Sequence, residues 1–250
     1  MKLLKLLILI LFSSSSVALS TEATNDTIFI GVNVNYTMPL VEIKNPLFNP
    51  EIESGILKDL AEAITQELKL KPVWLLLPKN RVAPSLLSGD VAMVCHLNEV
   101  WQPKIKKDVY WSQELYTSTN VIVHHGKKPI NKASDLYGER VGTVMNFIYQ
   151  NLDNEFAKKK IIREDGPNNE ANIRKLKYGR INYIVMSNLE FDYYKKIYPT
   201  LESADLKMDS VETKCALSKK APITLQQLNR AIDTIKKNGT FQKILKAYQN

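Results

Sequence analysis

Short apolar runs alternate with amphipathic stretches along most of the chain. Residues 27–32 and 71–77 are short and nearly continuous in apolar side chains, which predicts buried strands. Between them, apolar residues recur every three or four positions from 57 to 68, which predicts a helix with one buried face. A short helix ending near residue 87 and a strand at 91–96 follow. This β-α-β-α-β order is typical of an open, mostly parallel sheet.

The same order of elements returns in the second half of the chain. One short phrase marks the repeat: a Leu, a Gly three positions later and then an apolar strand, at Leu86–Gly89 and again at Leu176–Gly179. Each Gly suits the C-terminal cap of a helix, where the backbone takes a positive φ. Two copies of a helix–Gly–strand unit predict two similar α/β lobes.

Two further strands, at 120–124 and 213–218, fall outside both sets and are interpreted as the crossings between the lobes. We therefore expect an α/β protein in which each lobe is an open, mostly parallel sheet flanked by helices. One lobe is expected from residues 27–118 and 206–250, and the second from residues 119–205. Two lobes joined in this way enclose a cleft for a small molecule.

Residues 1–20 have the composition of a signal peptide. Lys2 and Lys5 precede an unbroken apolar run from Leu6 to Phe12, and small residues suit a cleavage site at Ala18-Leu19-Ser20. The apolar run is too short to span a bilayer, which needs about 20 residues. We therefore expect a periplasmic or secreted protein; an uncleaved N-terminal anchor is the alternative.

Charge and motif content exclude several classes of protein. The chain has a formal net charge of +8, but its lysines are scattered and lack the aromatic residues of a nucleic-acid groove, so no nucleic-acid partner is expected. Three histidines do not make a metal site, because the adjacent His124 and His125 point to opposite faces of a strand. No phosphate-binding loop or hydrolase motif is present, so we expect no metal, no cofactor and no enzyme activity.

Five segments, in order, resemble the family 3 periplasmic solute-binding proteins of the polar amino acid type. They are Gly55–Ile64, Arg81–Gly89, Tyr110-Trp111-Ser112, Ser134–Gly142 and Lys237–Phe241. The resemblance implies a two-lobed periplasmic-binding-protein-like fold with two crossing hinge strands. It also implies a monomer that captures a small polar solute in the cleft and presents it to an inner-membrane ABC permease. A stand-alone periplasmic sensor is the alternative.

The chain lacks both residues that the resemblance implies for binding the two charged groups of an amino acid. The resemblance implies an Arg shortly before Tyr110, to bind the ligand carboxylate, but residues 99–109 contain none. It also implies an Asp after the strand at 181–186, to pair with the α-ammonium, but Met186-Ser187-Asn188 stands there. An ordinary α-amino acid is therefore not the expected ligand.

Ligand contacts are expected where strands end at the cleft. Each candidate also has a structural interpretation, such as a packed loop aromatic for Tyr36, a surface ion pair for Arg81 or a satisfied core histidine for His96. The candidate ligand-binding residues are Tyr36, Arg81, His96, Asn98, Trp101, Thr143, Asn146, Phe147, Tyr149, Ser187 and Asn188.

A dehydratase-like enzyme on the same scaffold is a further alternative that the resemblance raises. Such an enzyme needs an acid in the cleft, and Glu99, Asp165 and Glu190 are the nearby candidates. Each is also accounted for as a surface or hinge residue, so binding without catalysis is the favoured interpretation.

The two cysteines, Cys95 and Cys215, are expected to form a disulfide, because an exported protein meets an oxidising compartment. The alternative is two buried free thiols. The resemblance implies that the strand containing Cys215 re-enters the first lobe antiparallel to the strand that ends near Cys95, which would bring the two residues together.

Overall fold

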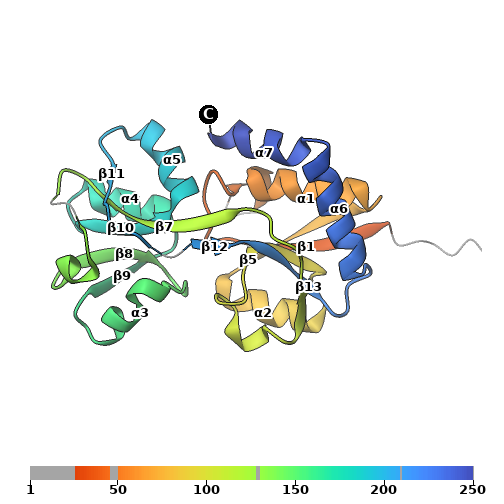
Figure 1. Ribbon diagram of the computed structural model, residues 1–250, viewed down its shortest axis with the longest axis horizontal. Coiled ribbons are helices and arrows are strands. Elements are labelled where there is room, and N and C mark those ends of the chain that lie inside the picture. The colour runs from red at the N-terminus through yellow and green to blue at the C-terminus, as the bar shows by residue number, and fades with distance from the viewer. Residues whose placement is uncertain (1–25, 46–49, 128–129, 209, 250) are drawn as a thin grey trace, which may run out of the picture.

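The computed structural model describes residues 26–45, 50–127, 130–208 and 210–249, so the predicted signal peptide lies outside the described residues. The strands divide between two main sheets, each covered by helices, with a short two-stranded sheet beside the first (Figure 1). We call the two main sheets with their helices the first and second lobes. None of the helices in the described residues has the length and apolar character that crossing a membrane requires.

The first lobe is built on a five-stranded sheet of order β4-β1-β5-β13-β6. β1 runs parallel to β4 and β5, whereas β13 runs antiparallel to β5 and β6. The strands are β1 (Thr27–Asn33), β4 (Lys71–Leu77), β5 (Met93–Leu97), β6 (Val109–Trp111) and β13 (Lys214–Ser218).

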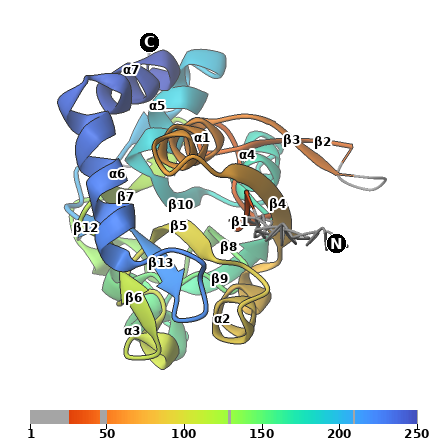
Figure 2. The ribbon, with the colours of Figure 1, turned by 90° about the vertical axis from the view of Figure 1, so that its right-hand side faces the viewer.

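Helices cover both faces of this sheet (Figure 2). One face packs against α1 (Ile56–Glu67), α6 (Leu225–Lys237) and α7 (Thr240–Gln249), and the other packs against α2 (Lys79–Ser88). Gly55 precedes α1 with φ of 123°, and a Cβ there would lie 2.5 Å from the Leu40 carbonyl oxygen, so the entry to α1 requires glycine.

The second lobe has the order β11-β7-β10-β8-β9. β10 is parallel to β8 and antiparallel to β7, and β12 (Ser210–Glu212) pairs with the beginning of β7. The strands are β7 (Thr117–His124), β8 (Arg140–Val144), β9 (Ile162–Gly166), β10 (Tyr183–Ser187) and β11 (Glu202–Ser203), and the helices are α3 (Gln150–Ala157), α4 (Asn169–Lys177) and α5 (Asn188–Ile197).

Several elements differ from the sequence-based expectation. A hairpin of β2 (Glu42–Lys44) and β3 (Glu51–Ser54) stands between β1 and α1, where the sequence pattern predicted no strand. β6, which the pattern also did not predict, follows a 3₁₀ turn at Pro103–Ile105, and a second 3₁₀ turn spans Ala133–Leu136. α2 begins at Lys79, and Pro78 is its N-cap.

The predicted disulfide is confirmed. Cys95 of β5 and Cys215 of β13 lie on neighbouring antiparallel strands, with their Cα atoms 3.9 Å apart. The register shifts between Lys214 and Ala216, so Cys215 lies at an irregularity of the ladder. The bond joins residues 120 positions apart, and the loop that it closes contains all helices and strands of the second lobe.

Candidate functional site

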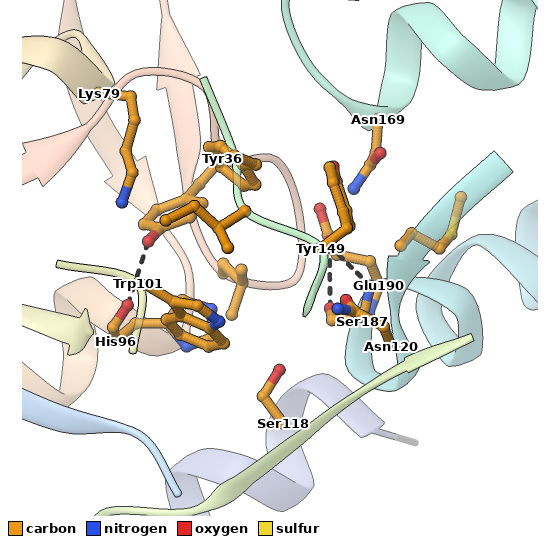
Figure 3. A pocket seen from close by; sticks show the side chains of 14 residues that line it. Tyr36, Lys79, His96, Trp101, Ser118, Asn120, Tyr149, Asn169, Ser187 and Glu190 are labelled. Atoms are coloured by element: carbon orange, nitrogen blue, oxygen red, sulfur yellow. Dashed lines mark hydrogen bonds between the residues drawn. The ribbon is translucent and has the colours of Figure 1, made fainter. Parts of the chain in front are cut away.

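A small cavity of about 50 Å³, partly open to solvent, lies between the lobes (Figure 3). The first lobe contributes Tyr36, Leu40, Lys79, His96 and Trp101 to its lining. The second contributes Ser118 and Asn120 from β7 together with Phe147, Ile148, Tyr149, Asn169, Met186, Ser187 and Glu190. Aromatic side chains line both walls, and Lys79 and Glu190 supply the amino and carboxyl groups among the lining residues.

Aromatic rings form the first-lobe wall. The Tyr36 hydroxyl donates to the His96 carbonyl oxygen at 3.1 Å, and the two rings meet edge to face. His96 stacks on Tyr116, with 2.8 Å between its Nδ1 and the Tyr116 hydroxyl, and lies beside Trp101. Burial, with the charge of Lys79, lowers the pKa of His96 to about 3. The imidazole is therefore neutral at physiological pH.

Lys79, the first residue of α2, is the cationic group of the cavity. Its ammonium lies 5.8 Å from the centre of the Phe147 ring, across the cleft. Burial lowers the pKa of Lys79 to about 8, so the side chain is mostly protonated at neutral pH. Among the described residues no carboxylate forms an ion pair with it.

Glu190 is the acidic group of the cavity, and the start of α5 holds its carboxyl group in place. Oε2 accepts from the Ser187 hydroxyl at 2.9 Å and from the Ser187 backbone N–H at 3.3 Å, while the Ser187 hydroxyl accepts from the Glu190 N–H. This reciprocal pattern is a capping box. Burial raises the pKa of Glu190, although hydrogen bonds from Asn169, Ser187 and Thr37 oppose the shift.

Contacts across the cleft show that the lobes are closed. The Thr37 hydroxyl donates to Oε1 of Glu190 at 3.2 Å, and the Asn35 side chain donates to the Pro167 carbonyl oxygen at 2.7 Å. Leu189, in α5 of the second lobe, is 5% exposed and packs within the apolar core of the first.

Six of the eleven candidate ligand residues line this cavity: Tyr36, His96, Trp101, Phe147, Tyr149 and Ser187. Arg81 is exposed on α2 and does not line it. Asn98 does not line it either, and its side chain donates to the Glu212 carbonyl oxygen and accepts from the Val100 N–H.

The remaining three candidates also lie outside the cavity lining. Thr143 is buried and donates to Asp165 at 2.8 Å. Asn146 is exposed with φ of 64°, in the turn before α3. The Asn188 side chain accepts from the Thr119 backbone N–H at 3.0 Å, so it anchors α5 to β7. The expectation that these side chains face the cleft rested on their positions near strand ends, which does not fix side-chain direction.

Sequence reasoning did not assign a binding role to several lining residues: Leu40, Lys79, Ser118, Asn120, Ile148, Asn169, Met186 and Glu190. The sequence contains a local pattern that points to two of these residues, Glu190 and Lys79. The Ser187-x-x-Glu190 spacing is that of a capping box, which fixes Glu190 beside the strand end at Ser187. Lys79 directly follows Pro78, a residue that commonly stands at a helix start.

Of the three acids considered for catalysis, Glu190 is the one in the cavity. Glu99 pairs with Lys214 at 3.0 Å and Asp165 pairs with Arg163 at 3.0 Å. Within the described ranges, no three His, Cys, Asp or Glu side chains gather in a way that could hold a metal ion.

Two α/β lobes that close on a polar and aromatic cavity define a two-lobed ligand-binding protein. Residues 46–250 match the family model of the bacterial extracellular solute-binding proteins, family 3, and the chain belongs to this family. The resemblance and the fold class predicted from the sequence are thereby confirmed, and so is the prediction of a solute-binding protein.

Individual relatives are distant. The "Probable amino-acid-binding protein YxeM" of Bacillus subtilis (strain 168) is 23% identical over 203 residues, which are 79% of this chain and 76% of that protein. An ancestral arginine-binding protein bound to arginine has a TM-score of 0.76 at 23% identity and covers 90% of this chain and 99% of its own. A periplasmic binding protein of Salmonella typhimurium with high arginine specificity has a TM-score of 0.73 at 18% identity, covering 90% and 99%. These structures share the fold.

Proposed function

We propose that this chain is exported, acts as a monomer and captures a small amine-bearing solute for an inner-membrane ABC permease. The observation that carries the proposal is the Glu190 carboxylate, 6% exposed, in an aromatic cavity to which both lobes contribute. A buried carboxylate is costly unless it is paired, and hydroxyl and amide donors compensate it only in part. An ammonium group in the cavity would complete the compensation.

Aromatic side chains around the cavity support the same ligand class. Tyr36, Trp101, Phe147 and Tyr149 all line it, and the faces of such rings attract cations. Affinity for an amine would therefore come from Glu190, and the aromatic walls would contact the rest of the molecule. The relative YxeM, by its name an amino-acid-binding protein, is consistent with an amine-bearing ligand.

Binding without chemical conversion is part of the proposal. A buried carboxyl with a raised pKa can serve as a general acid, and an ancestral amino-acid-binding protein described as a precursor of cyclohexadienyl dehydratase shares the fold, with a TM-score of 0.75. In this chain, however, both oxygens of the Glu190 carboxylate are engaged, Oε2 by Ser187 and Oε1 by Thr37. A positioned capping carboxylate suits recognition better than proton transfer.

A thermal-shift screen of the mature chain against amines, amino acids and organic acids tests this function. We expect amines to raise the Tm and organic acids without an amine to leave it unchanged. Glu190→Gln keeps an oxygen that can accept from Ser187, and it should abolish the amine response. Glu170→Gln, an exposed substitution on α4, is the matched control and should behave as wild type. Stabilisation by organic acids alone would refute the proposal.

A further inference from the structure

Lys79 and Glu190 lie on opposite sides of the cavity. Figure 3 shows Lys79 on one side of the cavity and Glu190 on the other, with Tyr36 and Trp101 between them. Lys79 belongs to the first lobe and Glu190 to the second. Burial lowers the pKa of Lys79, and no carboxylate acts against this shift. The carboxyl group of Glu190 instead acts on Tyr36, whose pKa is raised first by burial and second by Glu190. The two groups therefore do not neutralise each other.

Lys79 lacks a counter-ion in a place where a cation is costly. Its ammonium is directed toward the aromatic side chains of the cavity, and in the described part of the chain it approaches the Phe147 ring at 5.8 Å but no carboxylate. A partly desolvated ammonium without a partner favours an anion from the ligand. This wall of the cavity therefore suits a carboxylate.

The opposite wall has an unused acceptor next to Glu190. Asn169 is 4% exposed and lines the cavity, and its Oδ1 has no hydrogen-bond partner within the described residues. Buried polar atoms are almost always hydrogen-bonded, so this oxygen indicates a donor that arrives with the ligand. Two acceptors on one wall, a carboxylate and an amide oxygen, match the several N–H groups of an ammonium.

We propose that the ligand is an ω-amino acid, a short chain with its ammonium at Glu190 and Asn169 and its carboxylate at Lys79. This inference rests on the proposed function, because it extends amine capture by a second charge at the far end of the ligand. In an α-amino acid both charged groups are attached to the same carbon, whereas an ω-amino acid separates them along its chain, as the two walls separate Glu190 and Lys79. The absence of an Arg within 99–109 and of an Asp at 186–188 agrees with this arrangement.

Aromatic side chains account for the middle of the ligand. Tyr36 and Phe147 meet at 5.8 Å between ring centres from opposite lobes, and Trp101 and Tyr149 extend the two walls. These side chains can pack against methylene groups and exclude water when the lobes close. The ligand is therefore expected to place an unbranched apolar chain between its two charged ends.

Isothermal titration calorimetry with pairs of isomers tests the inference directly. The pairs are 4-aminobutyrate with 2-aminobutyrate, 5-aminopentanoate with 2-aminopentanoate, and 6-aminohexanoate with 2-aminohexanoate; butylamine and butyrate are the single-charge probes. Members of a pair have the same atoms, so only the separation of the charges differs. We expect at least one ω-isomer to bind ten times more tightly than its 2-amino isomer and than butylamine.

Lys79→Gln separates this inference from the proposed function. It should weaken binding of the ω-isomer about tenfold or more and leave butylamine binding within twofold, while the exposed Lys104→Gln changes neither. Equal binding of the isomers, or an unchanged ω-affinity in Lys79→Gln, would overturn the inference. If butylamine still bound and Glu190→Gln removed that binding, the proposed function would survive. If no amine of any kind bound, both would fall.

Discussion

The Thr37 hydroxyl donates to Oε1 of Glu190 at 3.2 Å and so joins the two lobes through the buried carboxylate of the cavity. Thr37 follows β1 in the first lobe, whereas Glu190 lies in the first turn of α5 in the second. One hydrogen bond therefore links the geometry of the binding site to the closed arrangement of the lobes. A ligand that binds Glu190 also acts on this link.

Thr37→Val should weaken ligand binding by favouring the open form. A hydrogen bond to a charged group contributes about 1.5–3 kcal/mol, and the loss of about 1.5 kcal/mol corresponds to roughly a tenfold higher Kd. Calorimetry measures the affinity, and small-angle X-ray scattering of the ligand-free variant should give a larger radius of gyration than wild type. Thr234→Val, which removes an exposed hydroxyl from α6, is the control. An unchanged Kd would show that this bond does not couple the lobes.

Ligand affinity should fall as the pH rises above about 8. Burial lowers the pKa of Lys79 to about 8, so the ammonium loses its proton there, and the binding of an anionic group falls by about tenfold per further pH unit. Calorimetry of a ω-amino acid between pH 7 and 9.5 measures this slope. Lys79→Arg keeps its charge throughout this range and should give a flat profile. A wild-type profile as flat as that of the variant would contradict the assignment of Lys79.

Acid should destabilise the fold through His96. Its folded pKa, lowered to about 3, lies below the unfolded value of 6.5, so its contribution to stability is complete above pH 6.5. As the pH falls toward 3 the unfolded chain gains a proton that the folded chain does not, at about 1.4 kcal/mol per pH unit. Urea unfolding at pH 7 and pH 5 measures the loss.

His96→Asn is the informative variant for this prediction, because asparagine tolerates the positive φ of 57° at this position. Its free energy of unfolding should depend less steeply on pH than that of wild type, whatever its absolute value. His125→Asn, at an exposed site, should keep the wild-type slope. Identical slopes for wild type and His96→Asn would show that another group causes the acid sensitivity.

Reduction of the Cys95–Cys215 disulfide should lower the free energy of unfolding substantially. The loop spans 120 residues, for which the chain-entropy argument gives a loss of about 4–5 kcal/mol. Urea unfolding with and without a reductant measures the loss, and the double variant Cys95→Ala with Cys215→Ala should be insensitive to the reductant. A difference below about 1 kcal/mol in wild type would mean that the entropic argument fails here.

Much of the fold was predictable because its signals are local. Asn168 caps α4 by accepting from the Ala171 N–H, and Thr224 and Gln227 form a capping box at the start of α6. These patterns depend on residues within one helical turn. The hairpin of β2 and β3 was not predicted, because its strands are short and mostly polar and two prolines, Pro46 and Pro50, stand between them in the sequence.

The binding site was harder to predict, because side-chain direction depends on where each helix begins. Residues two positions apart on an α-helix are about 200° apart around its axis. With α2 beginning at Lys79, that side chain faces the cavity and Arg81 points to solvent. Glu190 was considered only as an acid for catalysis. Its capping-box spacing with Ser187 is a local pattern, but its contact with Thr37 joins residues 153 positions apart and leaves no pattern in the sequence.

The position of β13 has a consequence for how the chain matures. This strand lies between β5 and β6, yet it is synthesised after every element of the second lobe. In a chain that emerges from its N-terminus, the second lobe is contiguous and can acquire its structure early, whereas the first lobe waits for residues 214–250. A chain cut short before Lys214 would leave Cys95 without its partner and β5 and β6 with unpaired edges, a species exposed to aggregation and proteolysis. Completion of the first lobe therefore depends on the last strand of the chain.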